Sequence, residues 1–238
     1  MKKAIVIGAT SGIGKSLALA LANDNYTVGI TARRLGLLEE LKAQYPDKFI
    51  TSEFDLTDIE SAIIFLDKLV LKIGTIDLLI LSSGNGQLND KLDFAIEKQT
   101  IDLNVAAFTA VADWAFKLFQ NQGSGHLVAI TSIAGLRGSR QSPAYGASKA
   151  YQISYLQSLK QKATNLKLPI HITDIRPGFV DTAMAKGEGM FWVAPVDKAA
   201  KQMIKAIYHK RQIVYITKRW RLIAVMLKVL PDFIYNKL

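Results

Sequence analysis

The chain has 238 residues, half of which are hydrophobic, and a formal net charge of +10. That length is enough for one α/β domain with a sizeable hydrophobic core. Because the chain contains no cysteine, disulfides, thiolate zinc sites and cysteine nucleophiles are excluded.

The positive charge is concentrated toward the C-terminal end. Residues 196–238 hold ten Lys or Arg against two Asp, which accounts for +8 of the net charge. The preceding residues are nearly balanced, so we expect no nucleic-acid-binding cleft across the main domain. No run reaches the roughly 18 apolar residues of a membrane-spanning helix. The first strand follows too closely on the N-terminus for a signal peptide, and we expect a cytoplasmic protein.

Short apolar runs alternate with longer helical stretches along the chain. The runs predicted as strands are residues 4–7, 27–31, 49–54, 76–81, 126–131, 170–175 and 213–216. Seven strands separated by helices predict an α/β fold with a doubly wound parallel sheet. Several runs are apolar at every position, as expected for strands covered by helices on both faces. We predict one such domain over residues 1–217, followed by a helical extension over 218–238.

A glycine-rich turn, Gly8-Ala9-Thr10-Ser11-Gly12-Ile13-Gly14, follows the first strand and precedes a helix predicted over 15–23. Its glycines allow the backbone to approach a pyrophosphate, which the N-terminus of the helix then stabilises. A plain strand-to-helix turn is the alternative. Strand, turn and helix occur in the order that a dinucleotide-binding Rossmann-type domain requires.

Two arginines, Arg33 and Arg34, end the second strand, where an NAD-binding protein would place a carboxylate for the ribose 2′-hydroxyl. A guanidinium fork suits a 2′-phosphate, and a carboxylate would repel it. Two solvated arginines at a helix start are the alternative. The sequence therefore favours NADP(H) over NAD(H).

A phenol and an ammonium, Tyr145 and Lys149, are four residues apart and share one face of a helix that we expect to begin near Pro143. A nearby cation favours phenolate and would lower the pKa of the phenol toward the working pH. This spacing alone is weak evidence. Ser132 lies thirteen residues before Tyr145, at a strand end where a parallel sheet presents its site, and Asn104 lies 28 residues earlier still.

Together these motifs resemble the short-chain dehydrogenase/reductase family over about residues 2–216. The Gly-x-x-x-Gly-x-Gly spacing is similar to that family's fingerprint, and its catalytic residues match Asn104, Ser132, Tyr145 and Lys149. The resemblance implies an oxidoreductase in which Tyr145 exchanges a proton with the substrate oxygen and Ser132 hydrogen-bonds that oxygen. It also implies that Lys149 lowers the pKa of Tyr145 and holds the nicotinamide ribose, while Asn104 anchors a water that links Lys149 to solvent.

The same resemblance implies the cofactor contacts. Asp55 would contact the adenine, although it equally suits an N-cap near Thr57, and Val180 and Thr182 would meet the carboxamide. The full expected set is Gly8, Thr10, Ser11, Gly12, Ile13, Gly14, Arg33, Arg34, Asp55, Leu56, Ser83, Gly84, Tyr145, Lys149, Pro177, Gly178, Val180 and Thr182.

Two positions depart from the family pattern. Ser11 stands where NADP-preferring relatives often carry a base, which keeps NAD(H) open as the alternative. Leu81-Ser82-Ser83-Gly84 replaces the family's Asn-Asn-Ala-Gly, whose asparagine stabilises the sheet in relatives. A non-catalytic dinucleotide-binding regulator is a further alternative, but it would need the glycine turn and not the phenol.

Residues 183–195 combine Met184, Met190, Phe191 and Trp192 with Gly187 and Gly189, a composition typical of a mobile lid with an apolar lining. Ordinary packing under a loop is the alternative. The segment predicts small, mostly apolar carbonyl or alcohol substrates. A metal site is not expected, because the three histidines lie far apart in the sequence and lack carboxylates at ligand spacing.

The extension over 218–238 is both basic and apolar. On a helical wheel Lys218, Arg221, Val225 and Lys228 share one stripe, so the wide apolar remainder of the surface must be covered by something. It is expected to pack on its own domain or on another subunit of a homodimer or homotetramer. The other possibility is a peripheral membrane contact, with Trp220, Phe233 and Tyr235 at the boundary.

Overall fold

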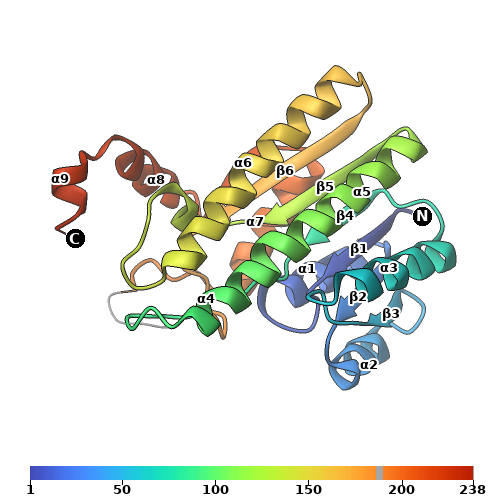
Figure 1. The fold of residues 1–238 in the computed structure, drawn as a ribbon. Helices are drawn as coiled ribbons and strands as arrows, with labels where there is room; N and C mark the ends of the chain where they lie inside the picture. Colours follow the sequence, from blue (N-terminus) through green and yellow to red (C-terminus); the bar gives the residue numbers. More distant parts are fainter. Residues whose placement is uncertain (186–189, 238) are drawn as a thin grey trace.

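Seven parallel strands form a single sheet in the order β3-β2-β1-β4-β5-β6-β7 (Figure 1). The computed structural model describes residues 1–185 and 190–237. The strands are β1 Lys3–Ile7, β2 Thr27–Ala32, β3 Phe49–Glu53, β4 Leu78–Leu81, β5 Gly125–Ile130, β6 Ile170–Pro177 and β7 Ile213–Ile216. All seven predicted strands and the doubly wound parallel sheet are confirmed.

Helices cover both faces of the sheet. They are α1 Gly12–Asn23, α2 Leu35–Gln44, α3 Ile59–Ile73, α4 Phe94–Ile101, α5 Phe108–Gln122, α6 Pro143–Asn165, α7 Val196–Tyr208, α8 Trp220–Val229 and α9 Asp232–Tyr235, with a π-helical turn η1 Asp102–Ala107 and a 3₁₀ turn η2 Ile133–Leu136. Residues of α1, α2 and α7 pack on one face of the sheet and residues of α3, α5 and α6 on the other. The start of α6 at Pro143 is as predicted.

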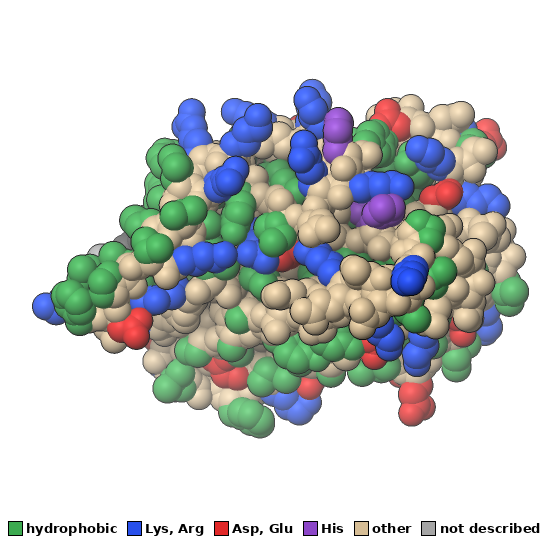
Figure 2. Space-filling view, turned by 90° about the horizontal axis from the view of Figure 1, so that it is seen from above, with side chains coloured by type: hydrophobic (Ala, Val, Ile, Leu, Met, Phe, Trp, Pro, Cys, Tyr) green, Lys and Arg blue, Asp and Glu red, His purple; other side chains and the backbone are tan. Residues whose placement is uncertain are grey.

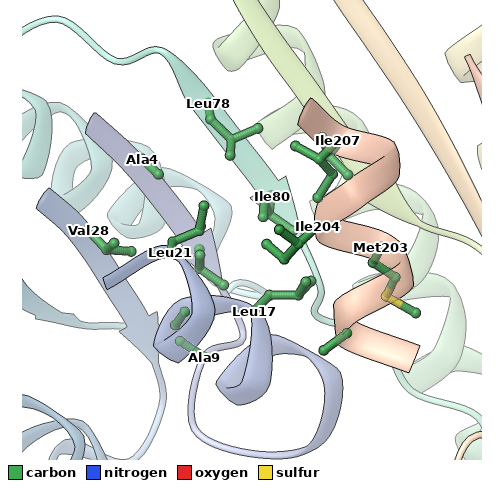
Figure 3. Packing of buried hydrophobic residues seen from close by; sticks show 14 of the residues in the cluster. Ala4, Ala9, Leu17, Leu21, Val28, Leu78, Ile80, Met203, Ile204 and Ile207 are labelled. Carbon is green, nitrogen blue, oxygen red and sulfur yellow. The ribbon is translucent and has the colours of Figure 1, made fainter. Parts of the chain in front are cut away.

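The two covered faces explain why several strand segments, such as residues 4–7 of β1, are apolar at every position. Within β1, Ala4 and Val6 belong to one buried cluster, whereas Ile5 and Ile7 belong to the other. Figure 3 shows side chains of α1 and α7 meeting over β1 and β4, with Leu17 near Ile204. Alternate side chains of a strand point to opposite faces, so a strand buried on both must be apolar at every position.

The strand order changes direction at β1, which lies between β2 and β4. At such a switch point the loops after the two neighbouring strands diverge and open a crevice at the carboxyl edge of the sheet.

The helix after the glycine turn begins at Gly12 rather than at residue 15. The Lys15 N–H already donates to the Ser11 carbonyl at 3.2 Å, so the end of the turn is also the first turn of α1.

Two of the histidines are neighbours despite their separation in sequence. Parallel pairing of β5 and β6 sets His126 opposite His171, with ring centroids 6.1 Å apart. The expectation that the histidines are far apart therefore fails in space for this pair. Burial lowers the pKa of His126 to about 4, and its Nε2 lies 2.8 Å from Thr173 Oγ1. Among the described residues, no three His, Asp or Glu side chains form a group able to hold a metal.

The C-terminal segment packs on its own domain along one side. Trp220 is buried against Gly178, where a Cβ would come within 2.0 Å of the indole. Arg137 Nη2 pairs with Asp232 Oδ1 at 2.7 Å, and the Tyr235 hydroxyl donates to the Gly138 carbonyl. The expectation that Trp220 and Tyr235 lie at an outer boundary is therefore wrong, because both are held against the domain.

The other side of the C-terminal segment faces outward. Its exposed apolar side chains are Leu222, Val225, Met226, Val229, Phe233 and Ile234. The segment projects from the body in Figure 1, and Figure 2 shows hydrophobic and basic side chains gathered at that end. Within residues 1–185 and 190–237, no helix has the length and apolar character to cross a membrane.

Candidate active site

A cavity of about 1020 Å³ opens along the carboxyl edge of the sheet. The predicted residues that line it are Gly8, Thr10, Ser11, Gly12, Ile13, Gly14, Arg33, Arg34, Asp55, Leu56, Ser83, Gly84, Ser132, Tyr145, Lys149, Pro177, Gly178, Val180 and Thr182. Asn104 alone among the predicted residues does not line the cavity. Loops after β1 to β6 contribute to one wall, as expected at the edge of a doubly wound sheet.

The glycine turn forms one end of this cavity. Gly8 has φ +84°, and its N–H and that of Ala9 donate to the Thr31 carbonyl at 3.0 and 3.1 Å. A Cβ on Gly14 would lie 2.1 Å from the Gly8 carbonyl oxygen. Glycine is therefore required at both positions for the turn to close on itself, which leaves the N-terminus of α1 facing the cavity.

Two guanidinium groups stand at the same end. Arg33 Nη1 lies 3.7 Å from Asp55 Oδ2, and Arg34 Nη2 lies 3.4 Å from Thr10 Oγ1. The Arg33 side chain is 70% exposed, so it is free to reorient toward an anion. Asp55 does not cap a helix, since its Oδ1 accepts from the Thr57 N–H whereas Asp58 caps α3. The N-cap alternative for Asp55 is wrong.

Ser132, Tyr145 and Lys149 meet at the middle of the cavity. Ser132 is the second residue after β5, and its Oγ accepts from the Ala134 N–H at 3.1 Å to cap η2. Tyr145 occupies the first turn of α6, and its ring lies so close to Gly86 that a Cβ there would approach it within 2.5 Å. Lys149 follows one turn later, with Nζ 5.8 Å from the centre of the phenol ring.

Burial is the largest influence on the pKa values of Tyr145 and Lys149. It raises the pKa of Tyr145, and the Ser132 hydroxyl opposes that rise only in part. Burial also lowers the pKa of Lys149 to about 8, partly opposed by the charge of Asp174. The direction for Tyr145 is opposite to the lowering expected from a neighbouring cation. The reason is that the phenol and the ammonium are both removed from water, which disfavours the charged form of each.

Asn104 is fully buried behind the cavity, inside η1. Its Oδ1 accepts from the Asn85 N–H at 2.9 Å, and its Nδ2 donates to the Asn85 carbonyl at 2.7 Å and to Ser148 Oγ at 3.0 Å. The side chain thus holds the loop after β4 against α6. Its main-chain carbonyl is linked to Lys149 through the side chain of Gln152.

Some residues of the site were missed from the sequence. Gln152 follows Lys149 by three residues and so shares its helix face, a spacing that could have identified it. Leu227 and Tyr235 reach the cavity from the C-terminal segment. No local pattern marks them, because their position depends on how α8 and α9 pack.

The cavity also has apolar lining. Phe179, Met184, Met190 and Leu227 contribute to it, together with the polar side chains of Arg137, Ser139, Gln141 and Ser142. Within the expected lid, Gly187 and Gly189 lie outside the described residues. Phe191 and Trp192 pack against Trp220 in an aromatic cluster, the first tilted and the second edge-to-face, at centroid distances of 5.0 and 6.1 Å. They cover the indole and do not belong to the lining of the cavity.

Comparisons with known proteins agree with this arrangement. A family model described as short chain dehydrogenase matches residues 2–190. An uncharacterized oxidoreductase of Mycobacterium tuberculosis is 33% identical over 216 residues, covering 87% of this chain and 84% of that protein.

Two solved structures share the fold. A short-chain dehydrogenase from Streptomyces avermitilis has a TM-score of 0.84 at 22% identity, over 99% of this chain and 94% of its own. A short chain dehydrogenase/reductase from Burkholderia phymatum, solved in complex with NAD, has a TM-score of 0.83 at 18% identity, over 94% of this chain and 92% of its own. Because the family model spans most of the sequence and the mycobacterial relative is similar over nearly all of it, the chain belongs to the short-chain dehydrogenase family of oxidoreductases.

Proposed function

We propose that the chain is an NADP(H)-dependent oxidoreductase that interconverts a carbonyl and an alcohol on a small, mostly apolar substrate. The observation that carries this proposal is the meeting of Ser132, Tyr145 and Lys149 in one cavity whose other end is the glycine turn. The test is NADPH oxidation by the purified chain across a panel of ketones and aldehydes. Cofactor binding without turnover of any carbonyl would favour the alternative, a non-catalytic dinucleotide-binding regulator.

In the reductive direction, the Tyr145 phenol donates its proton to the carbonyl oxygen. The Ser132 hydroxyl donates a hydrogen bond to the same oxygen and stabilises the negative charge that develops there. The Lys149 ammonium, 5.8 Å from the ring centre, stabilises the phenolate that is left behind. In oxidation the proton moves the opposite way, and the nicotinamide, when bound, supplies or accepts the hydride.

The cavity fits a dinucleotide at its glycine end. A Cβ on Gly8 would lie 2.9 Å from the Ser83 backbone nitrogen, and one on Gly14 would lie 2.1 Å from the Gly8 carbonyl oxygen. Glycine at both positions therefore keeps the turn tight, and the N-terminus of α1 favours a pyrophosphate there. Arg33 and Arg34 are the cations available for a 2′-phosphate. Ser11, which stands where NADP-preferring relatives often carry a base, favours NAD(H) instead, which is the alternative within the same family.

Arg33→Ala is expected to weaken NADPH binding about tenfold or more and to leave NADH binding nearly unchanged, because a charge-assisted contact to a phosphate contributes about 1.5–3 kcal/mol. Fluorescence titration of both cofactors gives the four dissociation constants. Arg221→Ala, which removes an exposed cation of α8, is the matched control. Equal affinity of the unmutated chain for NADPH and NADH would contradict the preference.

The substrate is assigned from the apolar side chains of the cavity. Met184, Met190 and Leu227 offer no charge to a sugar or a phosphate, and the Arg137 guanidinium that also lines the cavity is paired with Asp232. Ketones and aldehydes with aliphatic or aromatic bodies are therefore expected. We assign residues 183–195 as the substrate lid. A panel in which only sugars or phosphorylated compounds are turned over would contradict this substrate class.

The proposed cytoplasmic location is based on the absence of cysteine.

We further propose that 218–238 is an extension of the catalytic domain whose exposed side contacts a second copy of the chain in a homodimer or homotetramer. An anionic membrane surface is the alternative, because Lys218, Arg219 and Arg221 accompany the exposed apolar side chains. Deleting the segment would also remove the buried Trp220. Substitutions on the exposed side are therefore the better test.

Leu222→Glu combined with Val225→Glu is expected to lower the mass of the particle in light scattering, since both side chains are more than half exposed and a charge opposes burial at an interface. Leu71→Glu, at an 84% exposed leucine of α3, is the matched control. Sedimentation with anionic vesicles is measured in parallel. An unchanged mass with lost vesicle binding would favour the membrane, and no change in either would contradict both contacts.

A further inference from the structure

The buried Lys149 ammonium is held by two oxygen atoms of the protein. Its Nζ donates to the Ile130 carbonyl at 3.0 Å and to Gln152 Oε1 at 3.0 Å. The Gln152 side chain is itself buried, at 2% exposure. An ammonium has three N–H donors, so two of them fix its position while one stays available to groups in the cavity.

The other end of the Gln152 amide is anchored as well. Its Nε2 donates to the main-chain carbonyl of Asn104 at 2.8 Å. One planar amide therefore joins Lys149 on α6 to the backbone of η1, accepting at one end and donating at the other. Because a glutamine amide can do both at once, it is satisfied only in this orientation.

The π-helical turn makes the Asn104 carbonyl available. In an α-helix the Phe108 N–H would donate to the carbonyl four residues earlier, which is that of Asn104. Here the Phe108 N–H donates to the carbonyls of Leu103 and Val105 instead. Such π-helical turns within α-helices are frequent at functional sites. In this chain the released carbonyl is the partner of Gln152.

We infer that Gln152 is a positioning residue. It links the Lys149 ammonium to the π-helical turn and so fixes the position of the ammonium relative to the Tyr145 phenol. The inference rests on the proposed role of Lys149 in proton transfer. The link to Asn104 is made by a side chain of the chain itself, whereas the family resemblance implied a water there. Gln152 also supplies a neutral acceptor, so it orients the ammonium without adding a charge.

The charged groups around Lys149 set the direction of the expected effects. Tyr145 lies on the same helix, and Asp174 on β6 is paired with Arg176 at 2.6 Å. The remaining neighbours, the Ile130 carbonyl and Gln152, are neutral. Burial already lowers the pKa of Lys149 to about 8. Loss of an acceptor will lower the pKa further, and a carboxylate at position 152 will raise it.

Two nearly isosteric substitutions therefore act in opposite directions. In Gln152→Met, the pair formed by Tyr145 and Lys149 should lose its proton at lower pH. The fall in the rate of carbonyl reduction at high pH, called the basic limb of the pH–rate profile, should therefore shift to lower pH. In Gln152→Glu, the negative charge near Lys149 Nζ should shift the basic limb of the pH–rate profile to higher pH by about 1–3 units. Gln157→Met, an exposed glutamine of the same helix, is the control and should leave the limb unchanged.

The decisive measurement does not depend on turnover. The titration of Lys149 is followed by NMR of ¹³C-labelled lysine, with its resonance assigned by Lys149→Arg, and thermal melting shows that each variant is folded. The inference is supported if the pH midpoint of the Lys149 titration is lower in Gln152→Met than in the wild type and higher in Gln152→Glu. The same midpoint in all three proteins overturns it. If these midpoints shift but the wild type reduces no carbonyl, the proposed function fails while the positioning role stands.

Discussion

Tyr145→Phe is expected to reduce carbonyl turnover roughly 10²–10⁴-fold, because it removes the proposed proton donor and keeps the aromatic ring. The ring still packs against Gly86 beside Ser132. Cofactor affinity and thermal stability should therefore stay close to those of the wild type. Steady-state kinetics, cofactor titration and thermal unfolding measure the three quantities.

The matched control is Tyr151→Phe on the same helix. Its hydroxyl lies 2.8 Å from Thr109 Oγ1 and the side chain is 37% exposed, away from the cavity. This variant removes the same atom from α6 without touching the proposed chemistry, and full activity is expected. A Tyr145→Phe enzyme that keeps more than about a few per cent of wild-type turnover would contradict the assignment of the phenol as the acid.

Gly14→Ala is expected to abolish cofactor binding and to destabilise the fold. The new Cβ would lie 2.1 Å from the Gly8 carbonyl oxygen and 3.1 Å from Ser82 Oγ. Both contacts are shorter than van der Waals separation, and the first is to backbone, so the turn must open. Overpacking of this kind costs about 1–3 kcal/mol or more.

Gly36→Ala separates this steric effect from a general effect of removing a helical glycine. Gly36 lies in α2, and nothing is within 4 Å of where its Cβ would be. Because alanine has the higher helix propensity, this variant should be neutral or more stable by up to about 1 kcal/mol. Cofactor titration and thermal unfolding compare the two. Wild-type cofactor affinity in Gly14→Ala would refute the tight approach of α1 to the turn.

The local parts of the site could be predicted from the sequence because short-range patterns encode them. Tyr145 and Lys149 share a helix face through their spacing, and Ser132 follows a strand that its composition reveals. The spacing of Gln152 from Lys149 is also local, but the distant contact that anchors Gln152 could not be predicted. Gln152 pairs with a carbonyl that only the π-helical turn leaves free, 48 residues away in the chain.

The sequence by itself determined the seven strands, the doubly wound parallel sheet and the glycine turn after the first strand. Each depends on periodicity or on backbone freedom within a few residues. Only the tertiary structure decided that burial raises the pKa of Tyr145 and that Trp220 belongs to the interior. It also decided that Arg137 holds Asp232, 95 residues away. Desolvation and contacts between distant segments depend on what packs around a side chain, which no local pattern specifies.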